Sequence, residues 1–280
     1  MIVGCAMSWR SWLFPNRASM SATGSPQVVA EHYICAAPRD ASALMEPIGA
    51  LALPIVAGSW QCAQAVTPYL KPNEVRFTKE PLIQKSYILN EFLYFFIHIM
   101  KRHANDQLSA ENSKKLQTMV LPLVVRPAAV DAFFAHWPQE YRSGIERDFY
   151  KILDDVENEY ITRTDQLVAR GDTYAGPIPP QFANLRVELA LSSRLALGIL
   201  DLAGYEVEEG RPVHEIDFPF ASMVAGEAMK VLSVGDLRNF SELVSRASTA
   251  ITAYESSTQK PLAESTREFW AQVQPRVTNT

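Results

Sequence analysis

Residues 86–100 read SYILNEFLYFFIHIM, and this stretch decides the fold expected of the chain. Large apolar side chains stand on nearly every side of a helix drawn through it, which is typical of a helix surrounded by other helices. Lys85, Glu91 and Lys101 bracket or interrupt the run, which is too short to span a bilayer comfortably. We therefore predict a central core helix from Thr78, a suitable N-cap, to about His103.

The sequence beyond this helix has the same helical character. Ser109 is a suitable N-cap for a helix that is expected to kink or break at Pro122 and Pro127. The clearest pattern covers 141–169, where Ser143 and Glu146 have capping-box spacing. One apolar stripe recurs there every three or four residues, at Ile145, Phe149, Ile152, Val156, Tyr160 and Leu167. Further helices are predicted over 128–137, 182–203, 221–232 and 236–254, with a short one around Trp270.

These patterns predict an all-α fold: an irregular multi-helix array or bundle with at most one short β element, over 213–218. Three parts are expected. Residues 1–30 form a flexible, acid-poor leader, 31–170 an N-terminal helical block with the main core, and 181–280 a C-terminal helical block packed on it. The linker GDTYAGPIPP over 171–180, rich in proline and glycine, separates the blocks. The Ser/Arg composition of the leader leaves a targeting segment open as an alternative.

The stretch from Pro47 to Leu70 contains no charged residue and has the length of a membrane span. Three prolines and two glutamines interrupt it, so we predict a buried helical pair broken near Pro54 and no stable membrane span.

Composition excludes some classes of protein. The 280 residues carry a net charge of −5, so no overall basic field attracts nucleic acid. Cys5, Cys35 and Cys62 are far apart and odd in number, which argues against a disulfide scaffold and favours a reducing, cytoplasmic location. Phosphate-binding loops, nucleophile elbows and zinc-protease motifs are absent, so no cofactor and no metal site is predicted.

Asp154 and Asp155 lie in the segment ILDDVENEY. It resembles the aspartate-rich motif of the isoprenoid synthases, and that resemblance implies Mg²⁺ held against a diphosphate. The segment departs from the motif at Asn158, which replaces the third acidic residue. The apolar stripe of the same helix places these aspartates on its solvated side, which we take as the main interpretation.

Two histidines are weak candidates for chemistry. His98 lies in the core helix and is expected to be a buried histidine bonded to a carboxylate or the backbone, with ligation or acid–base catalysis as the alternative. His214 lies beside Glu215 and Asp217 in an irregular stretch, where loops often hold functional residues.

Aromatic side chains gather on the predicted core helices. They are ordinary core residues or, alternatively, the lining of a cavity for a small lipophilic ligand: Phe92, Phe95, Phe96, Phe133, Phe134 and Trp137.

Because reaction-specific motifs are missing, the sequence favours a helical protein-interaction or regulatory module without catalytic activity, whose partner is another protein. The alternative is a carrier or enzyme for a lipophilic small molecule bound between the helices, with isoprenoid-synthase-like chemistry as its most remote form.

Overall fold

The computed structural model of the chain describes residues 25–36, 41–70, 81–169, 186–202, 218–233, 236–258 and residue 270. Within these ranges the chain is almost entirely helical and contains no strand, which confirms the all-α prediction. Most of the predicted β element, 213–217, and the predicted linker lie outside the described residues.

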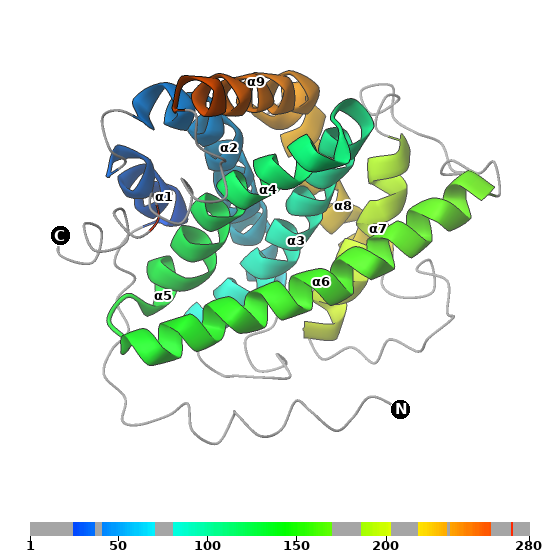
Figure 1. Ribbon diagram of the computed structural model, residues 1–280. Coiled ribbons are helices and arrows are strands. Elements are labelled where there is room, and N and C mark those ends of the chain that lie inside the picture. Colours follow the sequence, from blue (N-terminus) through cyan, green and yellow to red (C-terminus); the bar gives the residue numbers. More distant parts are fainter. Residues whose placement is uncertain are drawn as a thin grey trace.

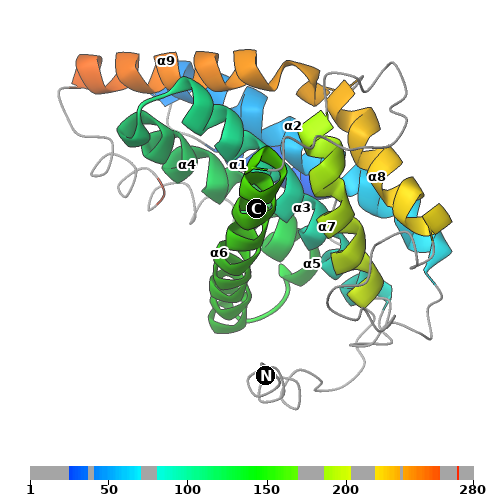
Figure 2. The ribbon, with the colours of Figure 1, turned by 90° about the vertical axis from the view of Figure 1, so that its right-hand side faces the viewer.

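The helices form an irregular array in which α9 and α6 lie on opposite sides, as both Figure 1 and Figure 2 show. In chain order they are α1 (Pro26–Cys35), α2 (Ser42–Val66) with the 3-10 turn η3 (Thr67–Tyr69), α3 (Pro81–Gln107), α4 (Ala110–Val125), the π-helix η4 (Arg126–Asp131), α5 (Ala132–Phe134), α6 (Gln139–Ala169), α7 (Arg186–Leu202), α8 (Phe218–Ser233), the 3-10 turn η7 (Asp236–Asn239) and α9 (Phe240–Thr258).

Helix α1 begins inside the segment 1–30 that the sequence assigns to the leader. The Ser25 hydroxyl accepts a hydrogen bond from the Val28 N–H, and Pro26 occupies the first turn, where its missing N–H costs nothing. Ala30 and Tyr33 on this short helix are both buried.

Helix α2 lies at the centre and packs against α1, α3, α4, α8 and α9. It continues through Pro47 and Pro54, so the predicted break near Pro54 is wrong. An internal proline costs a helix about 3 kcal/mol. Burial on several sides offsets that cost, and this burial cannot be seen in the local sequence. The contact with α8 is close: a Cβ added at Gly58 would lie 2.6 Å from Val231 Cγ1.

Helix α3 is the predicted core helix. Phe92, Phe95 and Phe96 are fully buried in it, which confirms that Phe95 is among the most buried side chains. One hydrophobic cluster runs through residues of every α-helix from α1 to α9.

The chain from Ala110 to Phe134 is one continuous helical rod made of α4, η4 and α5. Ser109 caps it as predicted, by accepting a hydrogen bond from the Asn112 N–H. Pro122 lies inside α4 without breaking it, and Pro127 lies in η4. The separate helix predicted over 128–137 is therefore wrong, because the rod continues from α4 and ends at Phe134.

Helix α6 has 31 residues and begins at Gln139, directly after Pro138. Ser143 and Glu146 are therefore helical residues, and the predicted capping box is wrong. Among the side chains that the structure describes, the stripe prediction is wrong at Ile152, which is exposed, while Leu153 is buried beside Phe149 and Val156. The Leu167 side chain lies outside them. The helices predicted over 182–203, 221–232 and 236–254 are present with shifted ends as α7, α8 and the η7–α9 pair.

In the part of the chain that the structure describes, two segments are long and apolar enough to cross a membrane: Ser42–Tyr69 and Ala110–Phe134. Of their most apolar windows, 56% and 78% are buried inside the protein. Packing against neighbouring helices therefore accounts for much of their apolar character.

Candidate functional site

The helical rod changes its hydrogen-bond pattern at Arg126. Pro127 has no N–H to donate to the carbonyl four residues before it, and the rod widens into the π-helix η4 from Arg126 to Asp131. Such widened turns often occur at functional positions. Here the turn brings Arg126 Nε within 3.2 Å of Asp131 Oδ1, and both side chains are buried.

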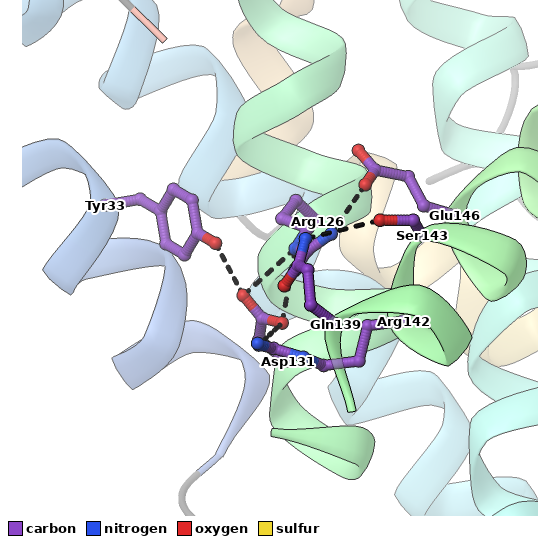
Figure 3. Close-up of polar contacts among 7 residues, drawn as sticks. All are labelled: Tyr33, Arg126, Asp131, Gln139, Arg142, Ser143 and Glu146. Atoms are coloured by element: carbon purple, nitrogen blue, oxygen red, sulfur yellow. Dashed lines mark hydrogen bonds and ion pairs between the residues drawn. The ribbon is translucent and has the colours of Figure 1, made fainter. Parts of the chain in front are cut away.

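A buried polar cluster is built around this pair, and we call it the Arg126 cluster (Figure 3). Its members are Tyr33, Arg126, Asp131, Gln139, Arg142 and Glu146.

Asp131 is the acceptor at the centre of the Arg126 cluster. The Tyr33 hydroxyl of α1 donates to Asp131 Oδ2 at 2.5 Å, and Arg142 Nη1 of α6 donates to Oδ1 at 3.1 Å. Arg126 Nε donates to the same carboxylate. One carboxylate thus connects three segments that are far apart in the sequence.

Arg126 uses its remaining nitrogens on α6. Its Nη1 donates to Glu146 Oε2 at 2.7 Å, and its Nη2 donates to Gln139 Oε1 at 3.2 Å. Burial lowers the pKa of Arg126, but Asp131 and Glu146 more than offset this and hold that pKa above its ordinary value. Burial and the neighbouring Asp131 carboxylate raise the pKa of Tyr33. Tyr33 therefore stays a neutral donor and Arg126 stays charged.

The Arg126 cluster balances two cations against two carboxylates and ties α1 and the start of α6 to η4. Such a buried, well-bonded network holds helices in one arrangement. Its members are satisfied mainly by one another, so we assign the cluster a structural role.

A second polar cluster lies between α3 and α6. The ring of His98 is 1% exposed, and its Nδ1 lies 2.9 Å from Glu157 Oε1. The same ring stacks on Tyr160 with the centroids 4.8 Å apart, and Lys101 Nζ lies 3.5 Å from Glu157 Oε2. The sequence predicted that His98 is buried and bonds a carboxylate or the backbone, and the structure shows a carboxylate partner.

Electrostatics in this second cluster favour the ionised carboxylate. Burial raises the pKa of Glu157, but the hydrogen bond with His98 and the charge of Lys101 together hold it below its ordinary value of 4.5. His98 Nε2 has no hydrogen-bond partner among the described residues. A histidine held by a carboxylate is an arrangement that general bases use, but a base must reach its substrate, and this ring is enclosed by the helices.

Helix α7 contacts both α3 and α6 through Arg194. Its Nη1 lies 2.8 Å from Glu91 Oε2 on α3, and its Nε lies 2.7 Å from Glu159 Oε2 on α6. The guanidinium also lies 5.6 Å from the centre of the Tyr160 ring. Gly198 makes room for this pair, because a Cβ there would collide with Glu91 and Arg194.

Two weak polar candidates from the sequence are exposed on α6. Asp154 and Asp155 both face solvent, as predicted. The described residues contain no group of three or more metal-ligating side chains. His214 lies outside the described residues.

The predicted aromatic residues form two sets. Phe92, Phe95 and Phe96 are enclosed in the core, where Phe95 contacts the rings of Phe96 and Tyr160 at 5.3 and 6.1 Å between centroids.

The second set leads outward, as a chain of ring contacts from the core to the surface. Phe133 contacts Phe134, Phe134 contacts the partly buried Trp137, and Trp137 contacts Tyr141 with the centroids 6.3 Å apart. Tyr141 is 45% exposed. We call Phe133, Phe134, Trp137 and Tyr141 the aromatic chain.

Sequence reasoning missed the surface that continues from Tyr141 along α6. Between 141 and 159, the positions within roughly 40° of Tyr141 around an ideal helix form one line, here called the α6 ridge. Its members are Tyr141, Ile145, Asp148, Ile152, Asp155 and Glu159. Ile152 is 46% exposed, and every charged member of the ridge is acidic. Because Ile152 has the spacing of the apolar stripe, the sequence predicted it to be buried and gave no sign of this surface.

No family model matches the chain, and neither the curated proteins nor the solved structures contain a match to it.

Proposed function

We propose that this chain is a helical protein-interaction module that binds a partner protein through the α6 ridge and has no catalytic activity of its own. The observation that carries the proposal is the exposure of Tyr141 and Ile152 on one line of a long outer helix. Among the described residues, only five large apolar side chains are clearly exposed, and three of them belong to α6: Tyr141, Ile152 and Ile161.

The ridge has the composition of a binding surface. Tyrosine and tryptophan are enriched where proteins meet, because they bury a large area at a small cost in side-chain entropy. Tyr141 is supported from behind by Trp137 and the rest of the aromatic chain, so its ring is held by packed neighbours. A rigid aromatic anchor loses little freedom on binding.

The buried clusters support the same proposal. The hydrogen bond of His98 with Glu157 connects α6 to α3, and ion pairs of Arg194 with Glu159 and of Arg126 with Glu146 connect it to α7 and η4. These contacts fix the helix in position along its length. A rigid helix that keeps one side open is suited to present a surface.

The test uses the full chain purified from its own host, and native mass spectrometry measures the mass of the chain together with anything bound to it. We expect wild type to carry a partner protein in a fixed ratio, and the double variant Tyr141→Ser/Ile152→Ser to have lost it. The matched control is Ile161→Ser, which changes an equally exposed isoleucine on the other side of α6, about 180° from Ile152.

Retention of the partner by the double variant would overturn the proposal. So would its loss from the Ile161→Ser control. A bound lipophilic molecule of low mass in place of a protein would favour the carrier hypothesis instead.

A further inference from the structure

We propose that the α6 ridge takes a basic amphipathic helix, laid alongside α6, as its specific partner class. This inference rests on the proposed function and names the kind of partner. It is carried by the order of side chains on the ridge, by their charge and by the length of the exposed line.

The ridge combines apolar and acidic side chains. Tyr141 and the partly buried Ile145 come first, followed by Asp148, Ile152, Asp155 and Glu159. A partner helix that packs its own apolar residues at three- and four-residue spacing meets Tyr141 and Ile152 as anchors. Lysine or arginine beside those apolar residues then meets Asp148 and Asp155, while Glu159 is already paired with Arg194 of α7.

The charge of the ridge selects the class of partner. An acidic partner would place its negative charges against those of the ridge, and this repulsion weakens its binding. Nucleic acid and anionic lipid surfaces carry negative charge and are disfavoured for the same reason. Opposite charge speeds the association of a basic partner and orients it on the surface.

Length sets the size of the partner. From Tyr141 to Glu159 the ridge extends about 27 Å along the helix axis, which matches a partner helix of about 18 residues. The N-terminal end is the more apolar, because Tyr141 continues from the aromatic chain, while the acidic groups Asp148 and Asp155 lie further along the ridge. This polarity fixes the direction in which the partner lies.

Two synthetic helical peptides serve as probes. Each has roughly 18 residues with leucine at helical spacing, and the polar positions are all lysine in one and all glutamate in the other. Binding to the full chain is measured by fluorescence anisotropy at low salt. We expect wild type to bind the lysine peptide at least about tenfold more tightly than the glutamate peptide, with the difference shrinking at high salt.

Neighbouring aspartates provide a matched pair of variants. Asp155 lies on the ridge, whereas Asp154, also exposed, is about 100° away around the helix. Asp155→Lys should weaken binding of the lysine peptide about tenfold and strengthen that of the glutamate peptide, while Asp154→Lys should change either by less than about twofold. Ile152→Ser should weaken both peptides, and Ile161→Ser neither.

Equal binding of the two peptides, or no binding of either, would overturn the inference. Equal effects of the two lysine substitutions would do the same. The peptide comparison on wild type decides the matter even if a variant fails to fold, as circular dichroism would reveal. If the native partner depends on Tyr141 and Ile152 while the peptides show no charge preference, the partner class is wrong and the proposed function stands.

Discussion

Replacing Asp131 with asparagine removes the charge at the centre of the Arg126 cluster without changing the size of the side chain. The Asp131 side chain is 6% exposed and accepts from Tyr33, Arg126 and Arg142. The variant leaves two largely buried arginines with one carboxylate in the cluster, that of Glu146. Removing one partner of a buried ion pair costs about 3–5 kcal/mol, because the remaining charge stays buried without compensation. We expect a loss of that size in the free energy of unfolding.

Glu146→Gln is the matched comparison, since it makes the same chemical change in the same cluster. The Glu146 side chain is 23% exposed, and it contacts Arg126, which keeps Asp131 as its partner. Water can replace part of the lost interaction, so we expect a loss of about 1 kcal/mol. Asp148→Asn, on the exposed side of α6, gives the baseline and should change stability by less than about 0.5 kcal/mol.

Urea unfolding followed by circular dichroism measures these differences, with the slope of the transition expected to stay constant. For a chain of this size, a loss of 3 kcal/mol corresponds to a fall in melting temperature on the order of 10 °C. Equal losses for Asp131→Asn and Glu146→Gln would refute the argument from burial. A loss below about 1 kcal/mol for Asp131→Asn would show that the cluster does not hold the fold.

Three further outcomes are expected. Gly58→Ala should destabilise the protein by about 1–3 kcal/mol in urea unfolding, because α8 leaves no space for a methyl group. Gly226→Ala is the control: a methyl group there has open space and should stabilise the protein by roughly 0.5–1 kcal/mol. A stabilising effect of Gly58→Ala would contradict the close contact between α2 and α8. Because the folded pKa of Glu157 lies below its ordinary value of 4.5, its carboxylate stabilises the fold above that pH, and this contribution is lost as the pH falls through the lowered pKa. The stability advantage of wild type over Glu157→Gln should therefore narrow below pH 4.5 in acid-unfolding series, and a constant difference would argue against the shift. Phe95→Ala should cost about 3–5 kcal/mol by thermal or urea unfolding, and a much smaller cost would indicate a ligand cavity around that ring.

The parts of the fold that the sequence predicted correctly are those set by local chemistry. The apolar run at 86–100 specified a buried helix whatever its neighbours, and Ser109 supplied a cap that satisfies N–H groups of its own helix. Both predictions depend on residues within a few positions of each other.

The errors arose where distant packing decides. Pro54 stays within α2 because helices from both halves of the chain cover that helix. Ile152 and Leu153 differ by one position, and the packing of α6 against α3, η4 and α7 determines which of the two is buried.

The candidate site was predictable only in part. His98 was expected to bond a carboxylate or the backbone, and that its partner is Glu157 follows from the packing of α3 on α6. The Tyr33–Asp131 contact joins residues 98 positions apart, and no pattern in the sequence relates them. The α6 ridge has apolar residues at helical spacing, so its sequence resembles that of a buried stripe.

The π-helix η4 has a consequence for how the length of this chain can vary. Each of its turns holds one residue more than an α-helical turn, so a deletion between Arg126 and Asp131 allows an ordinary helix to form in its place. The helix after the deletion would then keep nearly the same orientation relative to α4, because the wider turn already accommodates the extra residue. A deletion within α4 itself has no such extra residue and would rotate everything after it by about 100° and shift it by about 1.5 Å. Asp131 would then turn away from Tyr33, and Phe133 would leave its place in the core. We therefore expect natural deletions along this rod to be tolerated within the single turn of η4 and to be selected against in α4.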